Sequence, residues 1–318
     1  MRKNSTIYIF KFTVYFLFFC LTACNTGIES TKAIKMSKSD KKDIMPTTEE
    51  IFAEKISSQV VGNWEIGKKF VVADEKAFIV LKNEPGSLAS VPVGSELCYL
   101  GFETKDNAGG EEMCLLRFSD KTGKNIYVYN TNKKHEDCKK SFTGLDVPAL
   151  IDLDVVDLTK QHLQSQSLWI KTQLWYDEEG NVKKGKKYVP VKILSVEPGN
   201  MYFPIKIRFT DSDAKDVSEI LMNVRASNGI GVESRTFPSL FYLSDPKLKY
   251  PSITDENWAL IQEGKVAIGM TKDECRLSLG SPSDVDSGHD WNNTLDLWRY
   301  KDGTFLQFQD GLLVKYRH

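Results

Sequence analysis

The 318-residue chain contains four histidines and no C-x-x-C motif. Multi-histidine metal centres, zinc knuckles and thioredoxin-type redox sites need such residues at short spacing, so the sequence supports none of these sites. Its charges are balanced, with 42 Lys and Arg against 43 Asp and Glu, which argues against a strongly basic nucleic-acid-binding protein. The hydrophobic content of 41% is typical of a folded protein with a soluble surface. We therefore expect no metal, no cofactor and no nucleic-acid partner.

The sequence also lacks an apolar run of the ~20 residues that a membrane-spanning helix needs. Its N-terminus instead has Arg2 and Lys3 followed by a short apolar stretch over residues 12–21. A basic start followed by a short apolar stretch is typical of a secretory signal peptide. We assign residues 1–23 to this signal.

The signal ends in Leu21-Thr22-Ala23-Cys24, which resembles the lipobox of bacterial lipoproteins. The resemblance implies cleavage before Cys24 and lipid attachment to this cysteine, and several acyl chains hold a protein stably at a membrane. Residue 25 is Asn, not the Asp that retains many lipoproteins at the inner membrane, so the resemblance also implies residence at the outer membrane. No run of acidic residues follows Cys24, and we expect the protein to face the periplasm.

Residues 24–46 are polar, rich in Lys, Ser and Thr, and show no helical or strand periodicity. Such a composition does not bury enough apolar surface to fold. We interpret this segment as a flexible tether with a root-mean-square reach of about 25 Å.

Two similar series of elements follow, and we expect them to form β domains over residues 47–142 and 143–250. The first begins with a capping box at Thr47 and Glu50, which predicts a helix that stops at Gly62. Strands are then expected over residues 69–73, 77–81, 96–102, 113–118 and 125–129. The second series has a helix over 152–163 and strands over 168–176, 187–196, 202–210 and 219–224.

A short match supports a relation between the two series. Leu116–Asp120 reads LRFSD, and Ile207–Asp211 reads IRFTD 91 residues later. This spacing fits two duplicated domains better than a solenoid, although strand-turn-strand sequences can also be alike by chance. The number and length of strands in each copy resemble the small SH3-like barrels of bacterial envelope proteins.

The last segment, residues 251–318, has a different pattern. Thr254 is expected to cap a helix over 255–263, and Thr271 with Glu274 forms a second capping box. Three strands, expected over 295–300, 304–309 and 312–317, are separated by Asp-Gly pairs, which are strong hairpin signals. We therefore expect two helices on one side of a three-stranded antiparallel sheet.

The same segment resembles the BamE (SmpA/OmlA) family of outer-membrane lipoproteins. The matching residues are Val266, Gly269-Met270-Thr271, Leu279-Gly280-Ser281-Pro282, Trp298, Tyr300 and Phe308-Gln309-Asp310-Gly311. Their order and spacing are those of the family, which implies the two-helix, three-strand fold. The whole chain is then expected to be α+β and mostly β: two tandem β-barrel-like domains, each led by a short helix, followed by the BamE-like domain.

Four cysteines besides Cys24 remain after the signal: Cys98, Cys114, Cys138 and Cys275. An exported protein meets an oxidising compartment, where cysteines pair. If residues 96–102 and 113–118 form a hairpin folded about Asp106, Cys98 lies opposite Cys114, and we predict a cross-strand disulfide between them. The alternative is that the cysteines are small buried hydrophobic residues.

A polar loop predicted over residues 281–293 contains His289, Asp290 and Trp291. A tryptophan in such a loop either folds back onto the sheet or is exposed as an anchor for a partner. We hypothesise that these three residues form part of a partner-binding surface. Nearby aspartates lack the closing Glu of a calcium loop.

No motif in the sequence supplies a nucleophile, a base and an orienting residue together. We therefore expect a protein that is not an enzyme and acts non-catalytically, as a lipid-anchored scaffold for protein–protein interaction or outer-membrane assembly. The expected partner is another envelope protein. The alternative function is that of a lipoprotein that binds cell-wall polymer or glycan through its β domains.

Overall fold

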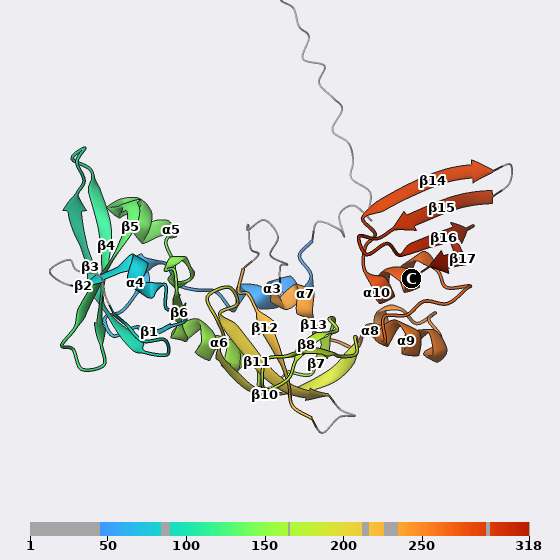
Figure 1. The fold of residues 1–318 in the computed structure, drawn as a ribbon, viewed down its shortest axis with the longest axis horizontal. Coiled ribbons are helices and arrows are strands. Elements are labelled where there is room, and N and C mark those ends of the chain that lie inside the picture. The colour runs from blue at the N-terminus through green and yellow to red at the C-terminus, as the bar shows by residue number, and fades with distance from the viewer. Residues whose placement is uncertain are drawn as a thin grey trace, which may run out of the picture. The chain divides into compact units, whose positions relative to one another are not determined.

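The computed structural model describes residues 45–83, 90–164, 166–211, 216–225, 235–290 and 293–317. The signal segment, Cys24, residues 25–44 and Trp291 lie outside these ranges. The described part of the chain is α+β and mostly β, with three antiparallel sheets (Figure 1), one of which curls into a half-barrel. None of its helices has the length and apolar character needed to cross a membrane.

The first sheet has six strands in the order β2-β5-β4-β3-β1-β6. Their bounds are β1 Lys69–Val72, β2 Leu81–Asn83, β3 Glu96–Asp106, β4 Glu112–Asp120, β5 Ile126–Lys134 and β6 Leu150–Asp152. Its core includes Phe70, Leu97 and Phe118, all 0% exposed. Strand β6 lies beyond residue 142, so this sheet extends past the boundary expected from the sequence.

One expected strand of this sheet is a helix. Residues 77–81 form α4 (Ala77–Val80) and the first residue of β2. Ala77 and Leu81 are fully buried, whereas Phe78 and Ile79 are exposed. A four-residue spacing of buried positions corresponds to one helical turn, and this spacing outweighs the strand preference of the apolar side chains.

Other short helices surround the first sheet. They are the 3₁₀ helices η1 (Val61–Asn63) and η2 (Gly144–Asp146), and the α-helix α5 (His135–Ser141). Helix α5 was not expected, because its sequence is dominated by charged residues. Its buried Cys138 faces the core of the first sheet.

The second sheet has seven strands in the order β13-β7-β10-β11-β12-β8-β9. Their bounds are β7 Leu168–Ile170, β8 Leu174–Tyr176, β9 Val182–Lys184, β10 Val189–Pro198, β11 Ile205–Asp211, β12 Ser218–Met222 and β13 Phe241–Tyr242. Helix α6 (Leu153–Leu163) is capped by Asp152 and packs on β10. The helix expected over residues 152–163 is therefore confirmed.

Helix α3 (Thr48–Glu54) begins at the predicted capping box of Thr47 and Glu50, but it ends before Gly62. Its Phe52, together with Ile56, belongs to the hydrophobic core of the second sheet. Phe52 also contacts Phe237 of helix α7 (Phe237–Leu240), with ring centroids 4.5 Å apart. The expectation that this helix leads the first β domain is therefore wrong, because its apolar face is buried against the second sheet.

The two sheets share one strand order. From edge to edge it is β6-β1-β3-β4-β5-β2 in the first and β13-β7-β10-β11-β12-β8 in the second, with β9 added at the end. The β4–β5 ladder pairs Leu116 with Tyr129, and the β11–β12 ladder pairs Ile207 with Ile220. Both members of the second pair follow their counterparts by 91 residues, the spacing of the sequence match.

An irregularity of the ladder also recurs. The register shifts by one residue at Leu100 in β3 and at Leu194 in β10. In each strand, the residue before the bulge pairs with a phenylalanine, and these two residues, Phe118 and Phe209, are aligned in the repeat. Both bulged leucines are exposed. Bulges are retained within families, so this shared defect supports the predicted duplication.

The third sheet has four strands in sequence order, β14 (Asp284–Asp290), β15 (Asn293–Arg299), β16 (Phe305–Gln309) and β17 (Leu312–Arg317). The preceding helices are α8 (Pro246–Lys249), α9 (Asp255–Gln262) and α10 (Lys272–Leu279). Caps at Thr254 and at the Thr271–Glu274 box are present as predicted. The core contains Trp258, Trp298 and Phe308.

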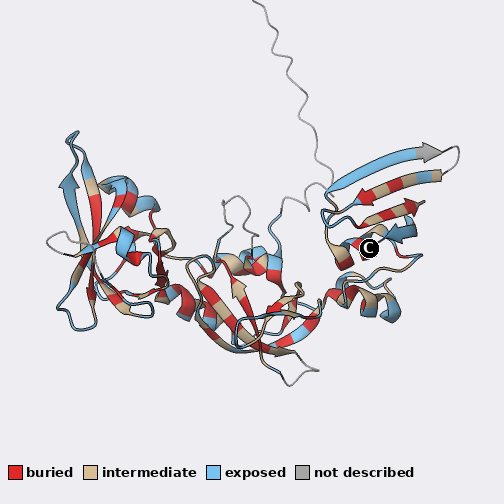
Figure 2. Cartoon of the chain, viewed as in Figure 1, coloured by how far each residue is buried: buried red, intermediate tan, exposed pale blue. Residues whose placement is uncertain are grey.

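Strand β14 corrects the expected loop over residues 281–293 and makes the sheet four-stranded, not three-stranded. Arg299 on β15 holds Asp284 at 2.6 Å and Asp286 at 2.8 Å. Opposite charges across neighbouring strands stabilise a sheet, and these pairs help to hold a polar sequence in strand form. Residues 284–288 are exposed on both faces (Figure 2).

Lys187 and Tyr188 link the second sheet to helix α10. Lys187 Nζ donates a hydrogen bond to the Ser278 carbonyl at 2.5 Å, and the Tyr188 hydroxyl donates to the Leu277 carbonyl at 3.1 Å. Burial, with Lys184 nearby, lowers the pKa of Lys187 to about 8.

This lowered pKa predicts a pH dependence of stability. Between pH 8 and 10.5 the unfolded chain holds the Lys187 proton more tightly than the folded chain, so the free energy of unfolding should rise with pH in this window. Allowing for partial exposure, the rise should be about 1–2 kcal/mol. Urea titrations at pH 8 and 10.5 should show a smaller rise for Lys187→Met than for the control Lys186→Met. Equal slopes for the two variants would contradict the prediction.

Candidate functional site

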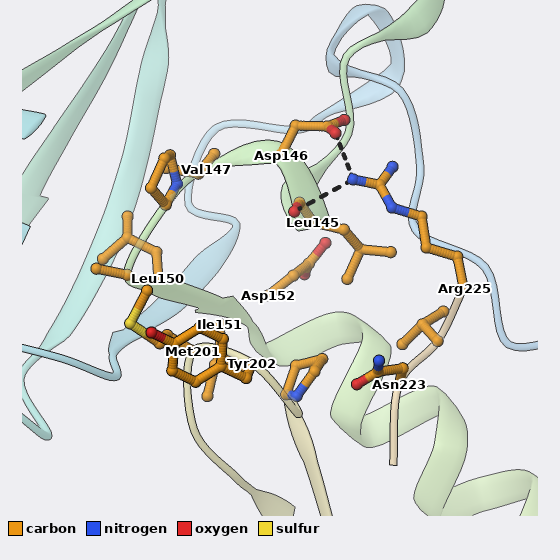
Figure 3. A pocket seen from close by; sticks show the side chains of 14 residues that line it. Leu145, Asp146, Val147, Leu150, Ile151, Asp152, Met201, Tyr202, Asn223 and Arg225 are labelled. Atoms are coloured by element: carbon orange, nitrogen blue, oxygen red, sulfur yellow. Dashed lines mark hydrogen bonds and ion pairs between the residues drawn. The ribbon is translucent and has the colours of Figure 1, made fainter. Parts of the chain in front are cut away.

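A cleft of about 710 Å³ lies between the segment containing η2 and β6 and one end of the second sheet (Figure 3). One side is formed by residues 145–152. The other is formed by Met201, Tyr202 and Pro204 of the β10–β11 loop and by Asn223, Val224 and Arg225, which follow β12. The cleft therefore brings together residues that are far apart in the sequence.

Asn223 gives the cleft a buried polar group that has no partner among the described residues. Its backbone N–H donates to the Arg235 carbonyl at 2.8 Å, which fixes the residue directly after β12. The side chain is largely buried, at 6% exposed for the residue, and Oδ1 accepts no hydrogen bond from the described residues. An unsatisfied buried acceptor costs about 1–3 kcal/mol. Asn223 Oδ1 would therefore gain from a ligand's donor, which reaches this solvent-inaccessible atom when neighbouring side chains move.

An ion pair between Arg225 and Asp146 connects the two sides of the cleft (Figure 3). Asp146 is held by the capping box of η2, where its carboxylate accepts from the Thr143 N–H at 2.8 Å. Burial acts to raise the pKa of Asp146, but the hydrogen bonds from Arg225 and Thr143 outweigh it and leave the pKa below its ordinary value. Asp146 therefore stays ionised and anchors Arg225, whose side chain is 56% exposed.

Tyr202 adds an aromatic surface to the cleft. The Asn200 carboxamide accepts from the backbone N–H groups of Tyr202 and Phe203, each at 2.9 Å, and this turn directs the chain at the tip of the β10–β11 loop. Tyr202 is 57% exposed. The cleft thus combines an exposed ring, a buried amide oxygen and an anchored guanidinium group.

Asp152 also lines the cleft, but its carboxylate is fully engaged in the fold. It accepts from Lys68 Nζ at 2.7 Å and from Ser58 Oγ at 2.8 Å, and it caps α6. A Cβ atom at Gly144 would lie 2.2 Å from Asp152 Oδ2, so this position has no room for a larger residue. These contacts indicate that Asp152 maintains the structure and does not act as an acid or base.

The described residues contain no group of three or more His, Cys, Asp or Glu side chains that could hold a metal ion. The side chains that line the cleft can form hydrogen bonds, ion pairs and stacking contacts. Such an arrangement is suited to binding a ligand.

The strand register contradicts the predicted disulfide between Cys98 and Cys114. Strand β3 pairs Cys98 with Ser119, whereas β4 pairs Cys114 with Thr104, and both cysteines are free. The hairpin turns over residues 107–111 and not about Asp106, and the bulge at Leu100 offsets this displacement by only one residue. The structure therefore separates the two thiols that the sequence placed opposite each other.

The other predicted site residues are only partly described. His289 and Asp290 lie at the end of strand β14 and not in a loop. Trp291 and Cys24 lie outside the described residues. The partner surface of His289, Asp290 and Trp291 therefore stays a hypothesis.

The cleft residues were not singled out from the sequence. Asn223, Arg225 and Tyr202 belong to no local motif, and Asp146 lies almost 80 residues before its partner Arg225. The aromatic turn around Tyr202 was the one local signal, because exposed aromatic residues in loops often mark binding surfaces.

Comparison of the chain with family models, with curated proteins and with solved structures finds no match.

Proposed function

We propose that this chain is a lipid-anchored protein of the bacterial cell envelope that acts by binding another envelope protein, as an interaction or outer-membrane assembly scaffold, and not as an enzyme. The observation that carries the proposal is the cleft, where the anchored Arg225 and the exposed Tyr202 lie with Asn223, whose buried oxygen accepts no hydrogen bond from the described residues. An extended segment of a partner would supply a backbone N–H to Asn223 and a carboxylate to Arg225.

The lipobox sequence at Cys24 supports anchoring at the outer membrane, with the folded part in the periplasm. The strand order β6-β1-β3-β4-β5, with a meander of β3, β4 and β5, supports a pair of SH3-like domains, because the second sheet repeats it. At the C-terminus, the buried Met270, Trp298 and Phe308 occupy the core positions that the BamE resemblance implies. The additional strand β14 goes beyond that pattern.

The exposed ring of Tyr202 favours a second candidate, binding of cell-wall polymer or glycan. Sugars present apolar ring faces and many hydroxyl groups, which match an aromatic surface next to amide and guanidinium groups. Under this alternative Asn223 accepts a sugar hydroxyl.

The variant Asn223→Ala tests the cleft. We expect about tenfold weaker binding of the partner, because the variant removes one hydrogen bond in a desolvated site. The full-length protein and the variant are purified from solubilised envelope, the co-purifying proteins are quantified by mass spectrometry, and sedimentation with purified peptidoglycan is measured in parallel. Tyr316→Ala, which removes an exposed tyrosine of the C-terminal sheet, is the control.

Barrel-assembly proteins that co-purify with the wild type and are depleted with Asn223→Ala would support the scaffold. Sedimentation with peptidoglycan that depends on Tyr202 and Asn223 would support the alternative. Unchanged partners and unchanged sedimentation for Asn223→Ala and Tyr202→Ala would exclude the cleft as the binding site.

A further inference from the structure

A pair of cysteines other than the predicted one meets in the first sheet. Cys114 lies on β4 where the β4–β5 ladder becomes irregular, between Met113 and Leu115. Thr131 Oγ1 donates to the Cys114 carbonyl at 2.9 Å, and Asn132 has a φ of 53°. This left-handed residue interrupts the ladder of β5, which continues to Lys134. The chain then enters α5, which packs against β4.

Helix α5 brings Cys138 onto the same part of the core. Both cysteines are 0% exposed and belong to the hydrophobic cluster of the first sheet. Met113, next to Cys114, pairs with Lys134, the N-cap of α5, so Cys138 lies one helical turn from this pair. Both thiols are free in the structure, and their mutual interaction raises the pKa of Cys114 and lowers that of Cys138. The position aligned with Cys114 in the second sheet is occupied by the buried Ile205, so the second copy fills this place with an ordinary apolar residue.

We propose that Cys114 and Cys138 form a disulfide bond that fastens α5 to β4. A disulfide bond requires two thiols that lie next to each other. Cys98 and Cys275 do not share a core position with another cysteine in this way. Cys98 lies opposite Ser119, and Cys275 is buried in the separate core of the C-terminal sheet.

The bond forms by thiol–disulfide exchange with a disulfide oxidant, such as the disulfide of an oxidising protein or oxidised glutathione. When the short helix α5 opens, it carries Cys138 out of the core, whereas Cys114 stays in strand β4, so Cys138 supplies the attacking thiolate. It displaces one sulfur of the oxidant and forms a mixed disulfide. Cys114 then gives up its proton, attacks the Cys138 sulfur and releases the second sulfur of the oxidant as a thiol. Two electrons and two protons pass to the oxidant.

Because both sulfurs are buried in the folded protein, exchange requires α5 to open or occurs before the core closes. The helix has seven residues, and the side chain of its N-cap residue Lys134 does not cap the helix with a hydrogen bond. Short helices without caps open easily.

The experiment equilibrates the purified full-length protein with oxidised glutathione, alkylates the remaining thiols under denaturing, non-reducing conditions and maps the peptides by mass spectrometry. We expect one linked pair of peptides, containing Cys114 and Cys138, that is two hydrogens lighter than the reduced pair. Cys98 and Cys275 should be recovered unlinked to each other and to this pair. Recovery of Cys114 and Cys138 as free alkylated residues, or linkage of Cys98 to Cys114, would overturn the proposal.

A thermal measurement gives an independent readout. The bond closes a loop from residue 114 to residue 138, so oxidation should raise the melting temperature of the first sheet by on the order of 5–10 °C. The variant with Cys98→Ser and Cys275→Ser should keep this difference between oxidised and reduced protein, and Cys138→Ser should abolish it. If Cys138→Ser does not fold, the wild-type mapping still decides, because it needs no variant. Neither experiment on the disulfide involves the cleft. A failure of the disulfide proposal can therefore be told apart from a failure of the proposed function.

Discussion

Lys68→Met is expected to lower the free energy of unfolding by about 3–5 kcal/mol, because it leaves a buried charge without its partner. The side chains of Lys68 and Asp152 are 3% and 0% exposed, and their charged atoms are 2.7 Å apart. In the variant, Ser58 and the N-terminus of α6 alone would compensate the Asp152 carboxylate. Asp152 ends β6 and caps α6, so the loss should loosen the connection between the first and second sheets.

The adjacent residue provides a matched control. Lys69 pairs with Glu96 at 3.1 Å, but its side chain is 57% exposed. Exposed pairs contribute little, and Lys69→Met should change stability by less than about 1 kcal/mol. Urea denaturation followed by tryptophan fluorescence measures both variants. Equal, small effects for Lys68→Met and Lys69→Met would show that the buried pair does not stabilise the fold.

A second change removes the buried charge itself. Adding Asp152→Asn to Lys68→Met should recover part of the lost stability, because a neutral amide costs less to bury than an unpaired carboxylate. The effect of Asp152→Asn alone on the wild type gives the comparison. If the double variant is less stable than Lys68→Met by that same amount, the two residues are not coupled and the prediction is wrong.

Phe118→Ala and Phe209→Ala should each lower stability by about 3–5 kcal/mol, the usual cost of removing a buried phenylalanine. The two residues are aligned in the repeat and both are 0% exposed. Phe118 contacts Phe70 at 5.4 Å between ring centroids, and Phe209 contacts Trp175 at 5.1 Å. They lie in different hydrophobic clusters, so each loss should fall mainly on its own sheet.

Hydrogen exchange measured by mass spectrometry locates the effect. Phe118→Ala should speed exchange in β3, β4 and β5 and leave β10, β11 and β12 protected, and Phe209→Ala should do the reverse. The control is Phe78→Ala, since Phe78 is 43% exposed and should change neither region. Equal deprotection of both sheets by either variant would show that they unfold as one unit.

Local signals in the sequence predicted elements well where the decisive interactions are local. The capping boxes at Thr47 and Thr271 use hydrogen bonds to residues three positions away, and both are present. The Asp-Gly pairs at 302–303 and 310–311 connect the expected last strands. The pentapeptides at Leu116 and Ile207 occupy equivalent central strands.

Predictions that depended on distant contacts were less successful. The hairpin register that should have joined Cys98 to Cys114 was displaced because the turn lies over residues 107–111 and not about Asp106. Strand β14 was missed because its polar residues are held by Arg299 on the next strand. The cleft was missed because the residues that form it have no common motif.

The amino-acid sequence alone determined the helix starts at the capping residues, the Asp-Gly turns of the last sheet and most apolar strands, since propensity, capping and side-chain alternation act over a few residues. It also indicated an N-terminal lipid-attachment signal, which is read from a linear motif. Only the tertiary structure decided that α3 packs on the second sheet, that α5 brings Cys138 to the core that holds Cys114, and that Asn223 lines a cleft. These outcomes depend on the packing of distant surfaces and on strand register, where a shift of one residue changes every neighbour.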